Sequence, residues 1–170
     1  RRPRADKAVV LEAVKQNGRM LYLADERLRA DRAIVAEAVS QTWEALKYTK
    51  GRCPDRQIVL QAVGQNWEAF KSAARELRKD HDIMLLAVKQ NWRAILSIED
   101  ELQTDRVIAL EAVRQSWEAL KHMKDMRADH EVVLIAVQQC WEALKFADDS
   151  VKADGKVVLE AMSSDFWGAF

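Results

Sequence analysis

Residues 105–121 read Asp-Arg-Val-Ile-Ala-Leu-Glu-Ala-Val-Arg-Gln-Ser-Trp-Glu-Ala-Leu-Lys, and related versions of this stretch recur along the whole chain. Asp105 is a favourable N-cap, because its carboxylate can accept hydrogen bonds from the free N–H groups of a first helical turn. Ala112, Val113 and Trp117 follow the three- and four-residue spacings of an amphipathic helix. The stretch therefore predicts a helix that begins after Asp105 and buries one face, followed by a shorter second element near Trp117.

The repeated unit has 24 or 25 residues and occurs seven times. It opens with Asp6, Asp31, Asp55, Asp80, Asp105, Asp129 and Asp154. An alanine stands seven residues after each aspartate, which indicates a close approach between neighbouring helices. Self-similarity at a fixed period of this length is typical of stacked helical repeats. We therefore predict an all-α fold, a helical-repeat solenoid of about seven units that forms one domain over residues 1–170, with the last unit incomplete.

The unit also resembles a known family. The pattern Asp-x-x-Val-Val-Leu-x-Ala-Val-x-Gln-Asn-Gly is carried by residues 6–18, and Trp replaces the final Gly in the next five units. It is similar to a short helical repeat catalogued as a domain of unknown function, which is found in secreted effectors of intracellular bacteria and in algal and dinoflagellate proteins. The resemblance implies an α-helical repeat array and no particular activity. The Trp versions are more similar to the algal and dinoflagellate members, which implies an accessory subunit of a protist or plastid assembly.

Composition narrows the classes of function. Lysine plus arginine equals aspartate plus glutamate at 27 each, so no overall field concentrates nucleic acid or an anionic membrane. No apolar stretch reaches the roughly 18 residues of a membrane span, and the N-terminus has no hydrophobic signal segment. We expect a soluble intracellular protein, and a plastid stays open as its compartment. Because the chain begins with Arg1 and stops inside its seventh unit, we expect a processed chain or a piece of a longer one.

A column of tryptophans is the most conspicuous candidate site. Its members share one position of the unit: Trp43, Trp67, Trp92, Trp117 and Trp141. Buried in the seams between units, these rings would form a structural ladder, which is the interpretation that we adopt. Facing outwards, they would form a stacking surface for nucleic acid, pigment or glycan, since flat aromatic faces bind such ligands. Exposure of the rings distinguishes the two interpretations.

The polar columns favour structure over chemistry. Six units carry a glutamine ten residues after the aspartate, and an invariant amide fits a structural ladder, with bonds to backbone or between the amides themselves, better than a base-reading code. His81, His122 and His130 lack metal-ligand spacing. No nucleophile–base set, phosphate-binding glycine loop or paired acid departs from the repeat pattern. The sequence therefore predicts a protein that is not an enzyme and has no cofactor and no metal site.

The last unit leaves apolar residues without an obvious covering element. Its register breaks at residues 163–165, and we expect the exposed edge to comprise Val157, Leu159, Phe166, Trp167 and Phe170. Contiguous exposed apolar surface usually marks an interface. We expect this candidate interface to be covered by another protein chain or by further repeats of a longer parent chain, while folding back over the sixth unit is the alternative. The predicted function is a non-catalytic scaffold for protein–protein interaction, an accessory or assembly subunit of a larger complex.

Overall fold

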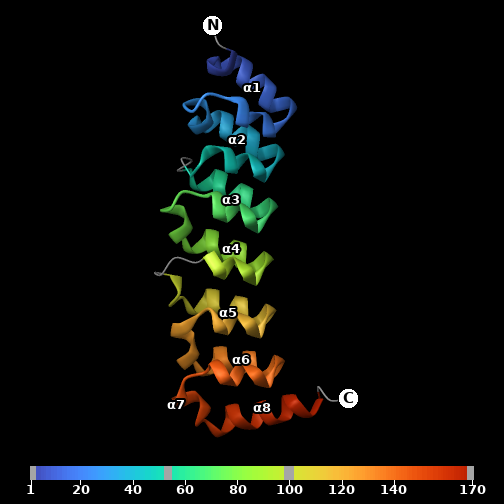
Figure 1. The fold of residues 1–170 in the computed structure, drawn as a ribbon, viewed down its shortest axis with the longest axis vertical. Helices are drawn as coiled ribbons and strands as arrows, with labels where there is room; N and C mark the ends of the chain where they lie inside the picture. The colour runs from blue at the N-terminus through green and yellow to red at the C-terminus, as the bar shows by residue number, and fades with distance from the viewer. Residues whose placement is uncertain (1–2, 52–54, 98–101, 168–170) are drawn as a thin grey trace. The chain divides into compact units, whose positions relative to one another are not determined.

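The computed structural model describes residues 3–51, 55–97 and 102–167, with the backbone alone for residues 164–167. Every regular element in these ranges is a helix, so the predicted all-α class is confirmed. The chain divides into two compact units, residues 1–90 and 91–170, and each is described by itself (Figure 1). In both units, α-helices alternate with short 3₁₀ helices, labelled η.

The first unit contains four α-helices. Its elements are η1 (Pro3–Ala5), α1 (Lys7–Gln16), η2 (Gly18–Leu23), η3 (Leu28–Ala30), α2 (Arg32–Gln41), η4 (Trp43–Thr49), α3 (Arg56–Gln65), η5 (Trp67–Ser72), η6 (Leu77–Lys79) and α4 (His81–Gln90). Helix α2 packs against both α1 and α3, and α3 packs against α4. Successive repeats therefore lie side by side in chain order within this unit (Figure 1).

The second unit repeats the same arrangement. Its elements are η7 (Trp92–Ser97), α5 (Arg106–Gln115), η9 (Trp117–Lys121), η10 (Lys124–Ala128), α6 (His130–Gln139), η11 (Trp141–Phe146), α7 (Asp149–Lys152) and α8 (Gly155–Trp167). Helix α6 packs against α5 on one side and α8 on the other.

Each α-helix from α1 to α6 begins after a capping aspartate and is ten residues long. Before α5, the carboxylate of Asp105 accepts the N–H groups of Val107 and Ile108 at 2.9 and 3.1 Å. These N–H groups have no partner inside the helix, so the cap satisfies donors that the first turn leaves free. The predicted capping role of the aspartates is confirmed, with equivalent bonds before the other five helices.

A single residue separates each of these α-helices from the following 3₁₀ helix, and this residue is extended after α1, α2, α3, α5 and α6. Ser116 has φ −158° and ψ 127°, yet its N–H still bonds to the carbonyl of Ala112 at 3.1 Å. Its hydroxyl accepts the N–H of Glu118 at 3.3 Å. Ser116 thus ends α5 and caps η9, because a short polar side chain can bond the backbone of the residues that follow it. The second element expected near Trp117 is therefore a 3₁₀ helix.

The glutamine near the end of the α-helix joins one repeat to the repeat before it. The amide Nε2 of Gln139 donates to the carbonyl of Val113 at 2.5 Å, and its Oε1 accepts the N–H of Trp117 at 2.9 Å. Both backbone groups lie where the preceding repeat changes from α to 3₁₀ helix, so they lack ordinary helical partners. Equivalent bonds to the preceding repeat are made by Gln41, Gln65 and Gln90. The predicted ladder of amides bonded to backbone is confirmed at these positions.

The core of each unit consists of the apolar faces of neighbouring helices. The alanines of the repeat are fully buried at Ala38, Ala62 and Ala136, where a larger side chain would meet the adjacent helix. Gly18 shows a similar restriction at the position where five later repeats have tryptophan. A Cβ atom placed on Gly18 would lie 2.4 Å from the carbonyl oxygen of Ala38. The first repeat therefore requires glycine at this position.

The seventh repeat departs from the others. Helix α8 has 13 residues and continues through Asp165, Phe166 and Trp167, where the other repeats have a single intervening residue and then the start of a 3₁₀ helix. The glutamine of the ladder is replaced by Ser164. In the described residues, the seventh repeat therefore has neither the amide rung nor the second element.

Candidate functional site

The tryptophan column is neither wholly buried nor wholly exposed. Trp92 is 9% exposed, Trp141 is 50% exposed, and the other three rings are intermediate. The rings of Trp92 and Trp117 contact rings of the following repeat, those of His122 and Phe146, each with centroids 6.3 Å apart. These contacts place the two tryptophans against the next repeat, as the structural interpretation of the ladder requires.

Cations lie over several of the ring faces. Lys47 Nζ is 4.3 Å from the centroid of the Trp43 ring, and Lys71 Nζ is 4.6 Å from that of Trp67. Each lysine is four residues after its tryptophan and belongs to the same 3₁₀ helix. A cation over an aromatic face is held by about 0.5–1 kcal/mol at exposed sites. The lysines therefore cover part of the ring surface that a flat ligand would need.

An apolar surface lies at the C-terminal end of the second unit. It consists of Trp141 on η11 together with Leu159 and Met162 on α8, which are 50%, 69% and 68% exposed. A hollow of about 200 Å³ beside it is lined by Trp141, Leu144, Val158, Ala161 and Met162. We call this region the C-terminal apolar surface. It contains no charged lining residue.

The positions of these side chains in the repeat explain their exposure. Met162 stands eight residues after its aspartate, at the position occupied by Val39, Val63 and Val137, which are fully buried. Each of those valines is followed by another repeat in its own unit, whereas no repeat follows Met162 among the described residues. Met162 thus exposes a position of the repeat that forms the seam with the following repeat elsewhere.

The structure places the five predicted interface residues in different situations. Leu159 is exposed as expected, but Val157 is only 3% exposed because its own chain already covers it. Phe166 and Trp167 belong to the backbone of α8, and their side chains lie outside the described residues, as does the whole of Phe170. Sequence reasoning missed Trp141 and Met162 as members of this surface. Comparing buried positions between repeats would have pointed to Met162.

The N-terminal end of the first unit shows the corresponding effect. Val9 is 50% exposed, whereas Ile34, Ile58 and Ile83 at the same position of the next three repeats are at most 4% exposed. A neighbouring hollow of about 160 Å³ is lined mainly by apolar residues of α1 and η2, including Val10 and Met20. Residues at the position of Val9 therefore face the preceding repeat, whereas residues at the position of Met162 face the following repeat.

A ladder of ion pairs links the first turns of successive helices. The basic residue after one aspartate contacts the aspartate of the next repeat, in the pairs Lys7–Asp31 at 2.7 Å, Arg56–Asp80 at 2.7 Å, Arg106–Asp129 at 2.8 Å and Arg32–Asp55. The hydrogen bond from Arg56 holds the pKa of Asp80 below its ordinary value, against the opposing effect of burial. Lys7 lowers the pKa of Asp31 and Arg32 that of Asp55 in the same way.

These ion pairs account for the acidic and basic residues in the first turns of the helices. The cations are between 39% and 78% exposed, and exposed ion pairs contribute at most about 1 kcal/mol each. No group of three metal-ligating side chains comes together in the part of the chain that the structure describes. Within the same part, no helix is both long and apolar enough to cross a membrane.

Comparison with known families agrees with the repeat architecture. The sequence model of a family described as a domain of unknown function (DUF4116) matches residues 6–50 and 55–103, which is more than half of the chain. The chain belongs to this family. The comparisons with curated proteins and with solved structures gave no significant match. Each DUF4116 match begins at a capping aspartate, Asp6 or Asp55, and covers two of the repeats of this chain.

One residue recurs at twice the repeat length, the length that each DUF4116 match covers, and the single-repeat pattern missed it. An arginine recurs every 49 residues near the end of every second repeat, at Arg29, Arg78 and Arg127. The Nη2 of Arg127 donates to the carbonyl of Lys121 at 2.9 Å, which ties the connector to the end of η9. A search for similarity at twice the repeat length would have found this arginine.

Proposed function

We propose that this DUF4116 chain is a non-catalytic helical-repeat scaffold for protein–protein interaction and serves as an accessory or assembly subunit of a larger complex. Its seven repeats over residues 1–170 act as a single solenoid in this proposal. A protist or plastid assembly is the setting that the tryptophan-bearing repeats suggest. The observation that carries the proposal is the C-terminal apolar surface.

The surface supports a docking role because it joins a seam position, that of Met162, to two other exposed apolar side chains. Leu159 and Met162 are three residues apart on α8, so they lie on one face of the helix. Together with Trp141 they expose apolar side chains whose counterparts in the internal repeats are buried or half-buried. An apolar helix face from another protein chain, or from a further repeat of a longer parent chain, would bury the same atoms. Burial of apolar area at about 25 cal/mol per Å² would drive this association.

The experiment is to place a charge on this surface without disturbing the fold. Both side chains are more than two-thirds exposed, so Leu159→Glu and Met162→Glu should each change the free energy of unfolding by less than about 0.5 kcal/mol. The matched control is Lys156→Glu, which introduces the same residue at an exposed polar position of α8. Sedimentation velocity and chemical crosslinking of the native assembly would report docking. Loss of docking in the two variants and its retention in the control are expected, and docking that survives both substitutions would disprove the proposal.

A ligand-stacking module is the second candidate function, and the half-exposed ring of Trp141 favours it. Nucleic acid, pigment or glycan would then stack on the exposed rings. Titration of the protein with a single-stranded oligonucleotide, monitored by tryptophan fluorescence, separates the two functions. Quenching that disappears in Trp141→Leu would favour stacking, whereas the scaffold predicts unchanged emission.

A further inference from the structure

A single Asn-Gly dipeptide occurs in the chain, Asn17 and Gly18, where α1 passes into η2. The two other asparagines, Asn66 and Asn91, hold the same position of their repeats, but a tryptophan follows each of them. The backbone nitrogen after an asparagine can attack the carbonyl carbon of its side chain. Glycine favours this attack, because it has no side chain to hinder the approach and leaves the backbone free to rotate. The environment of Asn17 in the fold therefore decides whether this dipeptide reacts.

The second repeat holds the dipeptide in place. The N–H of Gly18 donates to Oε1 of Gln41 at 3.1 Å, and Nε2 of Gln41 donates to the carbonyl of Lys15 at 2.6 Å. Gly18 is buried, and a Cβ atom on it would lie 2.4 Å from the carbonyl oxygen of Ala38. The peptide between Asn17 and Gly18 thus has little room to rotate. The nitrogen that would react is hydrogen-bonded, shielded from water and fixed in position by residues of α2.

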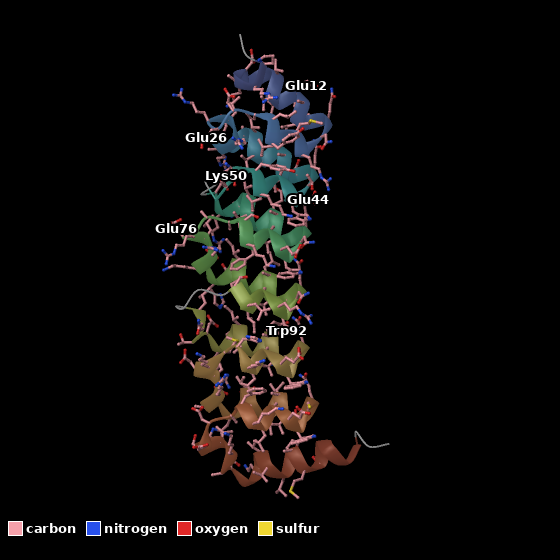
Figure 2. The ribbon with its side chains drawn as sticks, in the orientation of Figure 1. Glu12, Glu26, Glu44, Lys50, Glu76 and Trp92 are labelled. Carbon is pink, nitrogen blue, oxygen red and sulfur yellow. The ribbon has the colours of Figure 1, made fainter. Side chains whose placement is uncertain are left out.

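The side chain of Asn17 lies on the open side of this junction. Asn17 is exposed, and its Oδ1 accepts the N–H of Arg19 at 3.0 Å, which caps η2. Arg19 in turn forms an ion pair with Glu44 of η4. Figure 2 shows Glu44 on the side of the first unit opposite Lys50 and Glu76. The dipeptide therefore lies at the seam between repeats 1 and 2, away from the connectors, with its side-chain amide open to water.

We propose that Asn17 is a site of spontaneous deamidation that reacts when the first repeat separates from the second. Once the bond to Gln41 is broken, the Gly18 nitrogen attacks Cγ of Asn17 and closes a five-membered succinimide ring. The bond between Cγ and the side-chain nitrogen breaks, and this nitrogen leaves as ammonia with the proton from the Gly18 nitrogen. Water then opens one of the two C–N bonds of the ring. Opening at Cγ gives aspartate, and opening at the main-chain carbonyl gives isoaspartate.

The isoaspartate product does not fit the seam. Its main chain passes through Cβ and Cγ and is one carbon atom longer than that of Asn17, which displaces Gly18 from Gln41 and from the narrow space beside Ala38. The aspartate product keeps the length of the main chain, and aspartate caps a helix as well as asparagine does. Isoaspartate at position 17 therefore keeps the first repeat from docking again, so that one separation becomes permanent. This site does not depend on the C-terminal apolar surface.

The test follows the conversion of Asn17 in the intact chain at mildly alkaline pH. Mass spectrometry of proteolytic peptides distinguishes the amide from the acid, and chromatography separates the aspartate and isoaspartate peptides. In urea, Asn17 should react at least about tenfold faster than Asn66 and Asn91, because glycine follows it alone. In the folded chain it should react at least about tenfold more slowly than in urea, because a site that reacts only after local opening is protected while the seam is closed.

Two glutamine variants show whether the seam between repeats 1 and 2 provides this protection. Gln41→Leu removes the acceptor of the Gly18 N–H and should raise the rate in the folded chain about fivefold, the effect of losing one hydrogen bond. The matched control is Gln65→Leu, which removes the bond from Gln65 to the carbonyl of Val39 at the next seam and should leave the rate unchanged. Circular dichroism checks that both variants fold, and in urea both should react at the rate of the wild type.

Hydrogen exchange measures the consequence of the reaction. The isoaspartate form should lose protection in α1 and η2, whereas Asn17→Asp, which copies the other product, should keep it. Four outcomes would overturn the proposal. These are equal rates for the three asparagines in urea, equal rates for Asn17 in the folded chain and in urea, a rate in Gln41→Leu no higher than that in Gln65→Leu, and unchanged protection of α1 in the isoaspartate form.

Discussion

The amide ladder makes the most specific prediction about stability. Replacing Gln139 by leucine keeps most of the side-chain volume but removes both the donor to Val113 and the acceptor of the Trp117 N–H. A hydrogen bond contributes about 1 kcal/mol net, and an orphaned backbone group adds to the loss when water cannot reach it. The side chain of Gln139 is exposed, so water replaces some of the lost contact. We therefore expect a loss of about 2 kcal/mol in the free energy of unfolding.

Gln16 offers a control within the same sequence column. It occupies the ladder position of the first repeat, and no repeat precedes it among the described residues. Gln16→Leu changes the same side chain at the same point of an α-helix without breaking an equivalent rung. Its effect on the free energy of unfolding should be within about 0.5 kcal/mol of zero.

Urea denaturation followed by circular dichroism measures both variants. A loss of about 2 kcal/mol corresponds to a fall of about 4–8 °C in the melting temperature of a chain of this size. Gln139→Glu adds a second measurement, since a carboxylate keeps the acceptor but places negative charge beside the Val113 carbonyl. The loss of unfolding free energy in Gln139→Glu relative to wild type should become smaller as the pH falls, because a protonated carboxyl can donate a hydrogen bond to the Val113 carbonyl. Equal stability of Gln139→Leu and Gln16→Leu would refute the ladder as a source of stability.

Three further predictions concern other features of the repeat. Trp92→Ala should cost about 3–5 kcal/mol in urea denaturation, the range for removing a buried large aromatic, and a loss below about 1 kcal/mol would contradict its place in the seam. Gly18→Ala should destabilise the fold by about 1–3 kcal/mol, because the added Cβ would meet the backbone of the next repeat. Gly64→Ala should stabilise it by about 0.5–1 kcal/mol, because Gly64 lies in α3 with open space where a Cβ would be added. A higher melting temperature for Gly18→Ala than for Gly64→Ala would contradict both expectations. The pKa of Asp80 is lowered in the folded state, so its ion pair with Arg56 stabilises the fold at pH values above the ordinary aspartate pKa. This stabilisation is lost as the pH falls through the pKa of Asp80 in the folded state. Arg56→Gln should therefore reduce the difference in the free energy of unfolding between pH 7 and pH 3, measured by denaturation curves at the two pH values.

The tryptophan column shows how far a sequence position determines an environment. All five tryptophans share one place in the unit, yet Trp92 is almost buried and Trp141 is half exposed. The difference arises from the following repeat, which supplies a ring partner to Trp92 and to Trp117. The seventh repeat continues as α8 instead of forming a 3₁₀ helix, so the environment of Trp141 differs. The sequence pattern identifies the column but not the neighbours of each ring.

The sequence by itself determined the all-α class, the length of the repeat and the start of each helix. These properties depend on local interactions: the Asp105 carboxylate reaches N–H groups two and three residues away, and the apolar spacing follows the helical period. Even the structural role of the glutamines could be predicted, because an amide repeated without variation suits a fixed bond. Its partners, the carbonyl of Val113 and the N–H of Trp117, belong to the repeat before and could not be named from the sequence.

Only the tertiary structure decided which residues form surfaces. Met162 and Val137 occupy equivalent positions, but burial depends on whether another helix lies against them, which is a property of the packed array. Trp141 and Met162 likewise line one hollow although they come from different helices, η11 and α8. Local interactions act along the chain and can be inferred from it, whereas exposure and charge clusters arise between segments that meet only after the repeats have packed.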